Sequence, residues 1–311
     1  MTELARATLP FLTFLENLRA PWLEKVFLVL TRFGSEMAMI AVVVLLLWCV
    51  DKRRGYYALF VCLFGTVISQ VLKMLCMIPR PWMLDPEKVH PAQGALSDAR
   101  DYSFPSGHAQ NAVGLYGAVA ATSRRKGVRV ACVCLMVLVP LSRMVLGVHT
   151  PLDIAFGAFM SALLLALFWF WYRSGDDRST SILLGAGAVF CFAAVLFVSV
   201  YRWGDAADQT LLEEGRSNLW AMAGAMSGLW IAHEVDRRHT HYPTQAVWYG
   251  QIVKLVVGMA LIFGLRTVLK PILGTSGPMT ALRYFLMIGL VTTFWPMTFS
   301  SLSKLGKKGE K

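Results

Sequence analysis

Three polar stretches of the sequence lie at the borders of long apolar runs and together hold three fixed positive charges, two histidines and a carboxylate. They read KMLCMIPRP (residues 73–81), PSGH (residues 105–108) and SRMVLGVHTPLD (residues 142–153). Arg and Lys side chains donate hydrogen bonds to phosphate oxygens, and Arg can donate two in parallel. The types and spacing of these residues therefore predict phosphate chemistry.

Five of these residues are predicted to bind the phosphate group. Lys73, Arg80 and Arg143 supply the positive charges. Ser106 and Gly107 stand where a helix is expected to begin, with free backbone N–H groups and the positive end of the helix dipole. Glycine also lets an anion approach the backbone closely. We expect these five residues to form an anion-binding cradle.

Three further residues are predicted to be catalytic. His149 and Asp153 are four residues apart, so at the start of a helix they share a face, and the carboxylate can accept the N–H of the ring. A ring held in one tautomer has its other nitrogen free to attack as an activated nucleophile. His108 is then the natural general acid and base.

Each motif alone has a simpler structural interpretation. Lys73 and Arg80 are also the kind of cations that extend from the end of a span to the membrane surface. Ser106 is also an ordinary helix N-cap, and His149 with Asp153 forms a plausible local polar pair. The catalytic interpretation depends on all three motifs, in this order, meeting on one face of the membrane.

The elements that must position these residues are long apolar segments. The 311 residues are 56% hydrophobic and 16% charged, with a mean hydropathy of +0.53, and a soluble domain carries far more charge. The sequence predicts an all-α, polytopic membrane helical bundle of about nine transmembrane helices. The expected spans are residues 27–50, 55–78, 108–122, 128–147, 150–172, 181–201, 217–235, 247–269 and 281–301.

The positive charges predict the orientation of the chain. The net charge is +11, but Lys and Arg lie in short clusters between apolar runs, which argues against nucleic acid as a partner. With nine spans, these clusters and the C-terminal tail fall on one side, the cytoplasm. The N-terminus and all three motifs then lie on the extracytoplasmic side. We expect an interfacial segment (1–26), a catalytic core (27–172) and additional helices with a basic tail (173–311).

The three motifs resemble the signature of the type 2 phosphatidic acid phosphatase superfamily, over about residues 55–172. That superfamily includes lipid phosphate phosphatases and glucose-6-phosphatase, and the expected nine-span layout is similar to the latter. The resemblance implies that His149 attacks phosphorus to give a phosphohistidine, that Asp153 orients His149, and that His108 transfers the protons. It also implies a reaction that needs no metal and no other cofactor.

The predicted function is that of an integral-membrane phosphatase acting on a lipid phosphate or pyrophosphate. Its expected partners are membrane lipid and a phosphorylated amphiphile or small phosphoester. Hydrolysis of soluble phosphoesters such as a sugar phosphate, or transfer of the phosphoryl group to an acceptor other than water, are the alternative enzymatic functions. A transporter or lipid-binding scaffold is the alternative outside enzymes.

Overall fold

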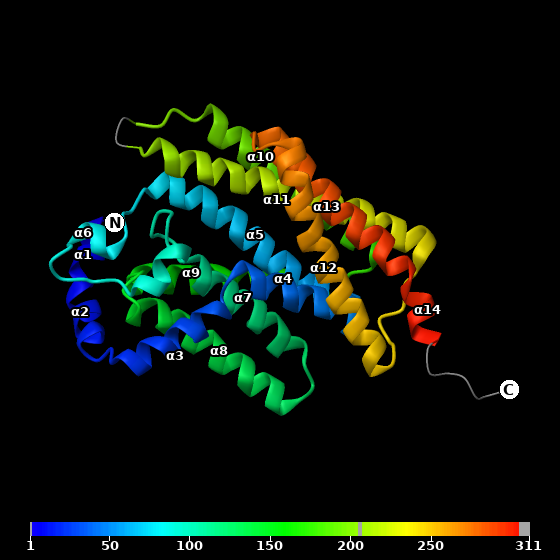
Figure 1. The fold of residues 1–311 in the computed structure, drawn as a ribbon, viewed down its shortest axis with the longest axis horizontal. Helices are drawn as coiled ribbons and strands as arrows, with labels where there is room; N and C mark the ends of the chain where they lie inside the picture. The colour runs from blue at the N-terminus through cyan, green and yellow to red at the C-terminus, as the bar shows by residue number, and fades with distance from the viewer. Residues whose placement is uncertain (1, 205–206, 305–311) are drawn as a thin grey trace. The chain divides into compact units, whose positions relative to one another are not determined.

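The computed structural model describes residues 2–204 and 207–304 (Figure 1). These residues form helices joined by loops, with no strand among them, so the prediction of an all-α fold is confirmed. The chain divides into two compact units. Unit 1 comprises Met1–Ile40, Tyr57–Trp169 and Trp203–Gly215, and unit 2 comprises Ala41–Tyr56, Phe170–Arg202 and Arg216–Lys311. The basic tail beyond Lys304, predicted to be cytoplasmic, lies outside the described residues.

Unit 1 is built from the helices of the N-terminal half. They are α1 (Thr2–Ala7), α2 (Leu9–Asn17), α3 (Pro21–Arg32), the start of α4 (Glu36–Leu45), most of α5 (Lys52–Cys76), α6 (Pro81–Leu84), the 3-10 turn η2 (Gln93–Asp98), α7 (Gly107–Thr122), α8 (Lys126–Val145) and most of α9 (Pro151–Ser174). Proline begins α3, α6 and α9, because the first residue of a helix has no intrahelical N–H bond to lose.

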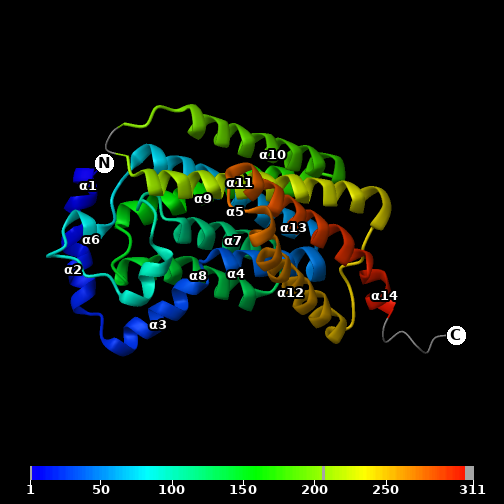
Figure 2. The ribbon, with the colours of Figure 1, turned by 45° about the horizontal axis from the view of Figure 1, so that its top comes forward.

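Helix α7 is buried over most of its length. It packs along α8, as Figures 1 and 2 both show. Glycines allow α9 to approach closely: a Cβ on Gly157 would lie 2.7 Å from the carbonyl oxygen of Ser106, and one on Gly117 would lie 2.5 Å from the side chain of Leu165. This close packing holds the first turn of α7 beside the first turns of α9.

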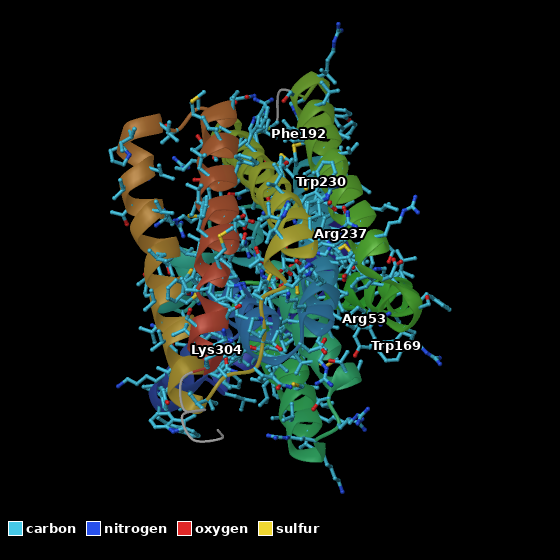
Figure 3. The ribbon with its side chains drawn as sticks, turned by 90° about the vertical axis from the view of Figure 1, so that its right-hand side faces the viewer. Arg53, Trp169, Phe192, Trp230, Arg237 and Lys304 are labelled. Atoms are coloured by element: carbon cyan, nitrogen blue, oxygen red, sulfur yellow. The ribbon has the colours of Figure 1, made fainter. Side chains whose placement is uncertain are left out.

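Unit 2 contains the remaining helices. They are the π-helical turn η1 (Leu46–Val50), α10 (Asp177–Val200), most of α11 (Gln209–Val235), the π-helical turn η3 (Asp236–Thr240), α12 (Trp248–Leu273), α13 (Gly277–Met297) and α14 (Phe299–Lys304). The unit also includes the second half of α4, the first turn of α5 and the last turn of α9. Helices α12 and α13 pack side by side (Figure 2). The Nε1 of Trp230 on α11, labelled in Figure 3, donates to Ser181 Oγ on α10 at 3.1 Å.

The expectation of nine spans is wrong. Within the described residues, six helices are long and apolar enough to cross a membrane, and the bent pair of α3 with α4 and η1 raises the count to seven. The predicted spans at 108–122 and 217–235 are not among them. Helix α7 has 16 residues, about 24 Å at 1.5 Å per residue, which is shorter than a hydrocarbon core of about 30 Å. Helix α11 is not apolar enough to count as a candidate span, because its polar residues lower its mean hydropathy.

The predicted span at 27–50 is also interrupted. It consists of α3 and α4–η1, which meet at a bend of 49° around residues 33–35. At this bend the backbone carbonyl of Phe33 accepts a hydrogen bond from the hydroxyl of Tyr116 on α7 at 2.8 Å. Because the bend directs α3 away from α4, α3 packs on the last part of α8 instead of continuing as a straight helix.

The N-terminal segment packs on the loop that follows α5. Ala5 is fully buried with Ile78 and Phe104, and Arg19 Nη2 donates to the carbonyl of His90 at 2.9 Å. The segment also exposes large apolar side chains, namely Leu4, Phe11, Phe14, Leu18, Trp22, Val26 and Val29. Such a face suits a segment at the membrane surface. The interfacial location of residues 1–26, like the boundaries 27–172 and 173–311, stays a prediction.

Candidate active site

All eight residues singled out from the sequence lie at one end of the helices of unit 1. Lys73 is in the last turn of α5 and Arg143 in the last turn of α8. Ser106, Gly107 and His108 form the start of α7, whereas Arg80, His149 and Asp153 lie in or next to the loops before α6 and α9. Six of the eight side chains are buried, and Gly107 and His108 are partly exposed.

The turn between α8 and α9 places His149. Gly147 adopts a left-handed conformation, with φ of 72°, and a Cβ there would lie 3.3 Å from the Cα of Pro91. A glycine meets both requirements at low cost. The turn is closed by the N–H of Val148, which donates to the carbonyl of Arg143 at 3.0 Å. This turn reverses the chain and therefore brings His149 back toward the end of α8.

His149 and Asp153 form the predicted pair. The Nδ1 of His149 lies 3.4 Å from Oδ2 of Asp153. The same carboxylate oxygen accepts from Ser103 Oγ and from the backbone N–H of Thr150, both at 2.7 Å. An oxygen held by these two donors is fixed in space, so it orients the ring with its N–H on Nδ1 and leaves Nε2 as the unprotonated nitrogen.

Arg80 lies directly against that free nitrogen. Its Nη1 is 2.9 Å from Nε2 of His149 and also donates to the carbonyl of Val148 at 2.9 Å. The remaining donors of the guanidinium face Asp101: Nε donates to its backbone carbonyl at 2.8 Å, and Nη2 donates to its carboxylate. The guanidinium thus lies within hydrogen-bond distance of any anion that approaches Nε2.

Arg143 is held by residues that the sequence motifs do not include. Its Nη1 donates to Thr31 Oγ1 at 2.8 Å, and its Nη2 to the carbonyl of Asp98 at 3.4 Å. Thr31 lies near the end of α3, 112 residues earlier in the chain, and is 3% exposed. No motif contains Thr31, and its sequence context gives no signal of this role. The N-terminal segment therefore contributes to the site.

The start of α7 has the features expected of an anion-binding helix end. Ser106 is its N-cap, with Oγ accepting from the N–H of Ala109 at 3.4 Å. Its own N–H donates to the carbonyl of Asp153 at 3.1 Å, which ties α7 to α9. The N–H groups of Gly107 and His108 precede the first hydrogen bond of the helix. A Cβ built on Gly107 would meet no described atom within 4 Å, so there is room in front of this backbone.

Burial and the positive charges of the site both favour the neutral form of the two histidines. Burial lowers the pKa of His149 well below its ordinary value of 6.5, and the positive charges of Arg80 and Arg143 lower it further. Burial likewise lowers the pKa of His108, and the positive charges of Arg143 and Arg80 lower it further.

Asp101 is a member of the site that the sequence analysis missed. Its carboxylate bridges Arg80 Nη2 and Lys73 Nζ, the latter at 3.2 Å. Burial raises the pKa of this carboxyl, but the charges of Lys73 and Arg80 outweigh that effect, so the pKa lies below its ordinary value. The sequence offers one weak signal, an acidic residue in the loop between the first two motifs.

Three buried polar atoms of the site have no hydrogen-bond partner among the described residues. They are Nε2 of His108, Nε of Arg143 and Oδ1 of Asp153. Buried polar atoms are nearly always satisfied in proteins, so each exception calls for an explanation. The nitrogens of His108 and Arg143 can therefore bond to an oxygen atom of a ligand.

Other polar clusters do not form a comparable centre. A polar cavity of about 350 Å³ in unit 2 is lined by Arg53 and Arg237, both labelled in Figure 3, but its charges are paired internally, for example Lys52 with Asp236 at 2.5 Å. Buried Lys254 donates to the carbonyls of Pro243 and Thr244. Among the described residues no three His, Cys, Asp or Glu side chains come together as metal ligands.

Comparisons with known proteins identify the family of the chain. The family model described as PAP2 superfamily matches residues 54–176, which include all eight predicted site residues, and the model described as PAP2 superfamily phosphatase, transmembrane extension, matches residues 220–308. The chain is 30% identical over 174 residues to phosphatidylglycerophosphatase B of Bacillus subtilis (strain 168), which covers 52% of this chain and 79% of the relative. No solved structure gives a significant match. The chain belongs to the PAP2 superfamily and is a multi-pass integral membrane phosphatase.

Proposed function

We propose that the protein hydrolyses a lipid phosphomonoester or diphosphate through a phosphohistidine on His149. The observation that carries the proposal is the arrangement of the ring, with Nδ1 facing Asp153 and Nε2 2.9 Å from Arg80 Nη1. The Bacillus subtilis relative bears the name phosphatidylglycerophosphatase B, which favours a lipid phosphate as the substrate. The alternative of a glucose-6-phosphatase-like hydrolase was based on a layout of nine spans, and the described residues contain six or seven candidate spans. That layout therefore no longer supports it.

Substrate binding depends on the fixed donors of the site. Arg80, Arg143 and Lys73 bind the phosphoryl oxygens, with the Nε of Arg143 as a donor that no described residue occupies. The N–H groups at the start of α7 and the positive end of its dipole add to this binding, with Ser106 and Gly107 setting the shape of the backbone. These donors stabilise the charge of the phosphoryl group as it is transferred.

In the first step Nε2 of His149 attacks phosphorus, a P–N bond forms, and the bond to the lipid oxygen breaks. Asp153 compensates the positive charge that develops on the imidazole. His108 gives a proton to the leaving oxygen. The negative charge of the bound phosphate opposes the effect of Arg143 that lowers the pKa of His108, so substrate binding favours the protonated form that this step requires.

In the second step water attacks the phosphohistidine. His108, now neutral, accepts a proton from the water, and the P–N bond breaks to release phosphate and restore His149. The residues of the chain supply every proton transfer in this scheme, in keeping with the predicted absence of a metal or other cofactor. An acceptor hydroxyl in place of water would give phosphotransfer by the same step.

We further propose that the site faces the extracytoplasmic side. Helix α8 is one of the candidate spans and carries Arg143 in its last turn. The opposite end of α8 begins next to Arg124, Arg125 and Lys126. Positive clusters of this kind favour the cytoplasm, so the other end of α8, with the site, is assigned to the outside.

A panel of substrates tests the proposal. Purified wild-type protein in detergent is assayed for phosphate release from phosphatidylglycerophosphate, phosphatidate, a polyprenyl diphosphate and a sugar phosphate, with a chelator present. The expected result is release from one or more of the lipids at a rate well above that from the sugar phosphate. Release from the sugar phosphate alone, or a strict need for a divalent ion, contradicts the proposal. Transport of lipid across vesicles without any hydrolysis favours the transporter alternative.

A further inference from the structure

We infer that Asp101 determines the substrate class of the site: its carboxylate competes with incoming anions, so that dianionic phosphate groups bind and monoanionic phosphodiesters are rejected. The inference rests on the proposed function, because it concerns the same phosphate site. The carboxylate occupies the position of an anion: Oδ2 lies 3.2 Å from Lys73 Nζ, and Oδ1 accepts from Arg80 Nη2. Lys73 and Arg80 are 5% and 3% exposed, whereas the side chain of Asp101 is 34% exposed.

The donors of Arg80 show that Asp101 and a phosphate compete for the same contacts. Nη1 bonds Val148 and His149, and Nε and Nη2 both face Asp101. A phosphate that binds the Nε–Nη2 edge of Arg80 with two parallel hydrogen bonds must take over a donor that Asp101 holds. Arg143 differs, because its buried Nε has no partner among the described residues. Binding therefore starts at Arg143 and is completed when the carboxylate leaves Arg80 and Lys73.

Only the side chain of Asp101 needs to move. The backbone that follows Asp101 is held independently of the carboxylate: Lys73 Nζ donates to the carbonyl of Tyr102 at 2.6 Å, and the N–H of Ser103 donates to the carbonyl of Ile78 at 2.8 Å. A rotation of a partly exposed side chain is a fast, local motion. The loop thus keeps its fold while the carboxylate is displaced, and it should also keep its fold in a variant without the charge.

The charge of the ligand decides whether this displacement is favourable. A phosphomonoester carries about −1.5 to −2 charges at pH 7, whereas a phosphodiester carries one, the same as the carboxylate. When a diester displaces the Asp101 carboxylate from Lys73 and Arg80, one single negative charge takes the place of another. The diester and the displaced carboxylate then lie close together and repel each other. A monoester or a terminal diphosphate gains attraction to both cations. The anionic phospholipids that surround the protein are diesters, so the carboxylate keeps them from filling the site.

Two small ligands that lack lipid tails test the inference. Methyl phosphate, a monoester, and dimethyl phosphate, a diester, are titrated calorimetrically into the purified full-length protein. In the wild type, dimethyl phosphate is expected to bind at least about tenfold more weakly, because a like-charge contact costs several kcal/mol. In Asp101→Asn its affinity is expected to rise about tenfold, which shrinks the difference between the ligands. Glu87→Gln, at an exposed position of the connection between α5 and α7, should leave the difference in affinity between the two ligands unchanged.

Three results overturn the inference: equal affinities in the wild type, an Asp101→Asn variant whose only change is weaker binding of methyl phosphate, or a Glu87→Gln variant that behaves like Asp101→Asn. If Asp101→Asn fails to fold, Asp101→Ser replaces it. Equal affinities of the wild type for methyl phosphate and dimethyl phosphate overturn the inference even if neither variant folds. Failure of the proposed function looks different, since the wild type then releases no phosphate from lipids even when the two ligands bind as expected.

Discussion

His149 is buried between a carboxylate and a guanidinium, and burial is the main influence on its protonation state. Asp153 faces Nδ1 and Arg80 faces Nε2. The pKa values of His149 and His108 both lie below 6.5, chiefly because burial disfavours the imidazolium form. His149 therefore favours its unprotonated form at neutral pH, and the proposed attack needs no separate base to activate it.

The lowered pKa values predict how stability depends on pH. Between the folded-state pKa and 6.5 the unfolded chain binds more protons than the folded chain, so folding is opposed as the pH falls through this range. The contribution of the two histidines is fully present above pH 6.5 and is lost below it. The apparent Tm in detergent should fall between pH 7 and pH 5, and less steeply in the His108→Gln/His149→Gln double variant.

The control for this measurement is His239→Gln, because His239 is exposed and lies outside the site. This variant should follow the wild-type curve. A double variant whose Tm falls as steeply as that of the wild type would show that the two site histidines do not carry the acid destabilisation.

Motif residues could be predicted from the sequence, whereas their supporting residues could not. The spacing of His149 and Asp153 predicts that their side chains share a helix face, and the distance between Nδ1 and Oδ2 agrees with that expectation. Thr31 and Asp101 touch Arg143 and Arg80, but each is a single polar residue in a segment without a motif. Only the fold brings them to the site, because 112 residues separate Thr31 from Arg143.

At the scale of elements, the site depends on four helix ends that lie close together, those of α5, α7, α8 and α9. Helix α7 begins against α9, where Ser106 donates to the carbonyl of Asp153. The sequence predicted this apolar helix as a membrane span. That prediction failed because an apolar sequence does not distinguish a helix buried among other helices from one that faces lipid, and α7 is surrounded by protein. Its length of 16 residues was the only contrary sign.

Gly157→Ala should separate α7 from α9. Its Cβ would lie 2.7 Å from the carbonyl oxygen of Ser106, a backbone atom that cannot move without shifting the start of α7. We expect about 1–3 kcal/mol of destabilisation, the usual cost of overpacking, and at least a tenfold lower kcat/KM for phosphate release, since a displacement of about 1 Å costs that much or more.

Gly264→Ala in α12 is the matched control. A Cβ there meets no described atom within 4 Å, so the exchange should leave activity unchanged and stabilise the helix slightly, by about 0.5–1 kcal/mol. Equal effects of the two substitutions on activity and on Tm would contradict the role assigned to the contact between α7 and α9.

At the scale of the whole molecule, the chain is a membrane phosphatase, and its described residues include six candidate spans, or seven if the bent pair counts as one. The orientation now depends on local charge, because the alternation over nine spans no longer holds. The basic connection from α7 to α8 and the loop before α7 lie at opposite ends of α8 and its neighbours. Positive clusters favour the cytoplasm, so the loop with residue 87 should face outward.

Single cysteines test this orientation. In a background without native cysteines, Glu87→Cys should react with a membrane-impermeant maleimide in intact cells, and Arg125→Cys only after the membrane is opened. Both positions are exposed in the structure, so burial does not limit either reaction. The reverse pattern would place the catalytic site in the cytoplasm.

The most direct measurement of the central claim is to trap the covalent intermediate. Wild-type protein mixed with a substrate that carries ³²P in its terminal phosphate is quenched within milliseconds and digested. We expect an acid-labile, alkali-stable label on the peptide that contains His149, and neither label nor phosphate release from His149→Ala. A label on another residue, or phosphate release from His149→Ala at the wild-type rate, would contradict the assignment of His149 as the nucleophile.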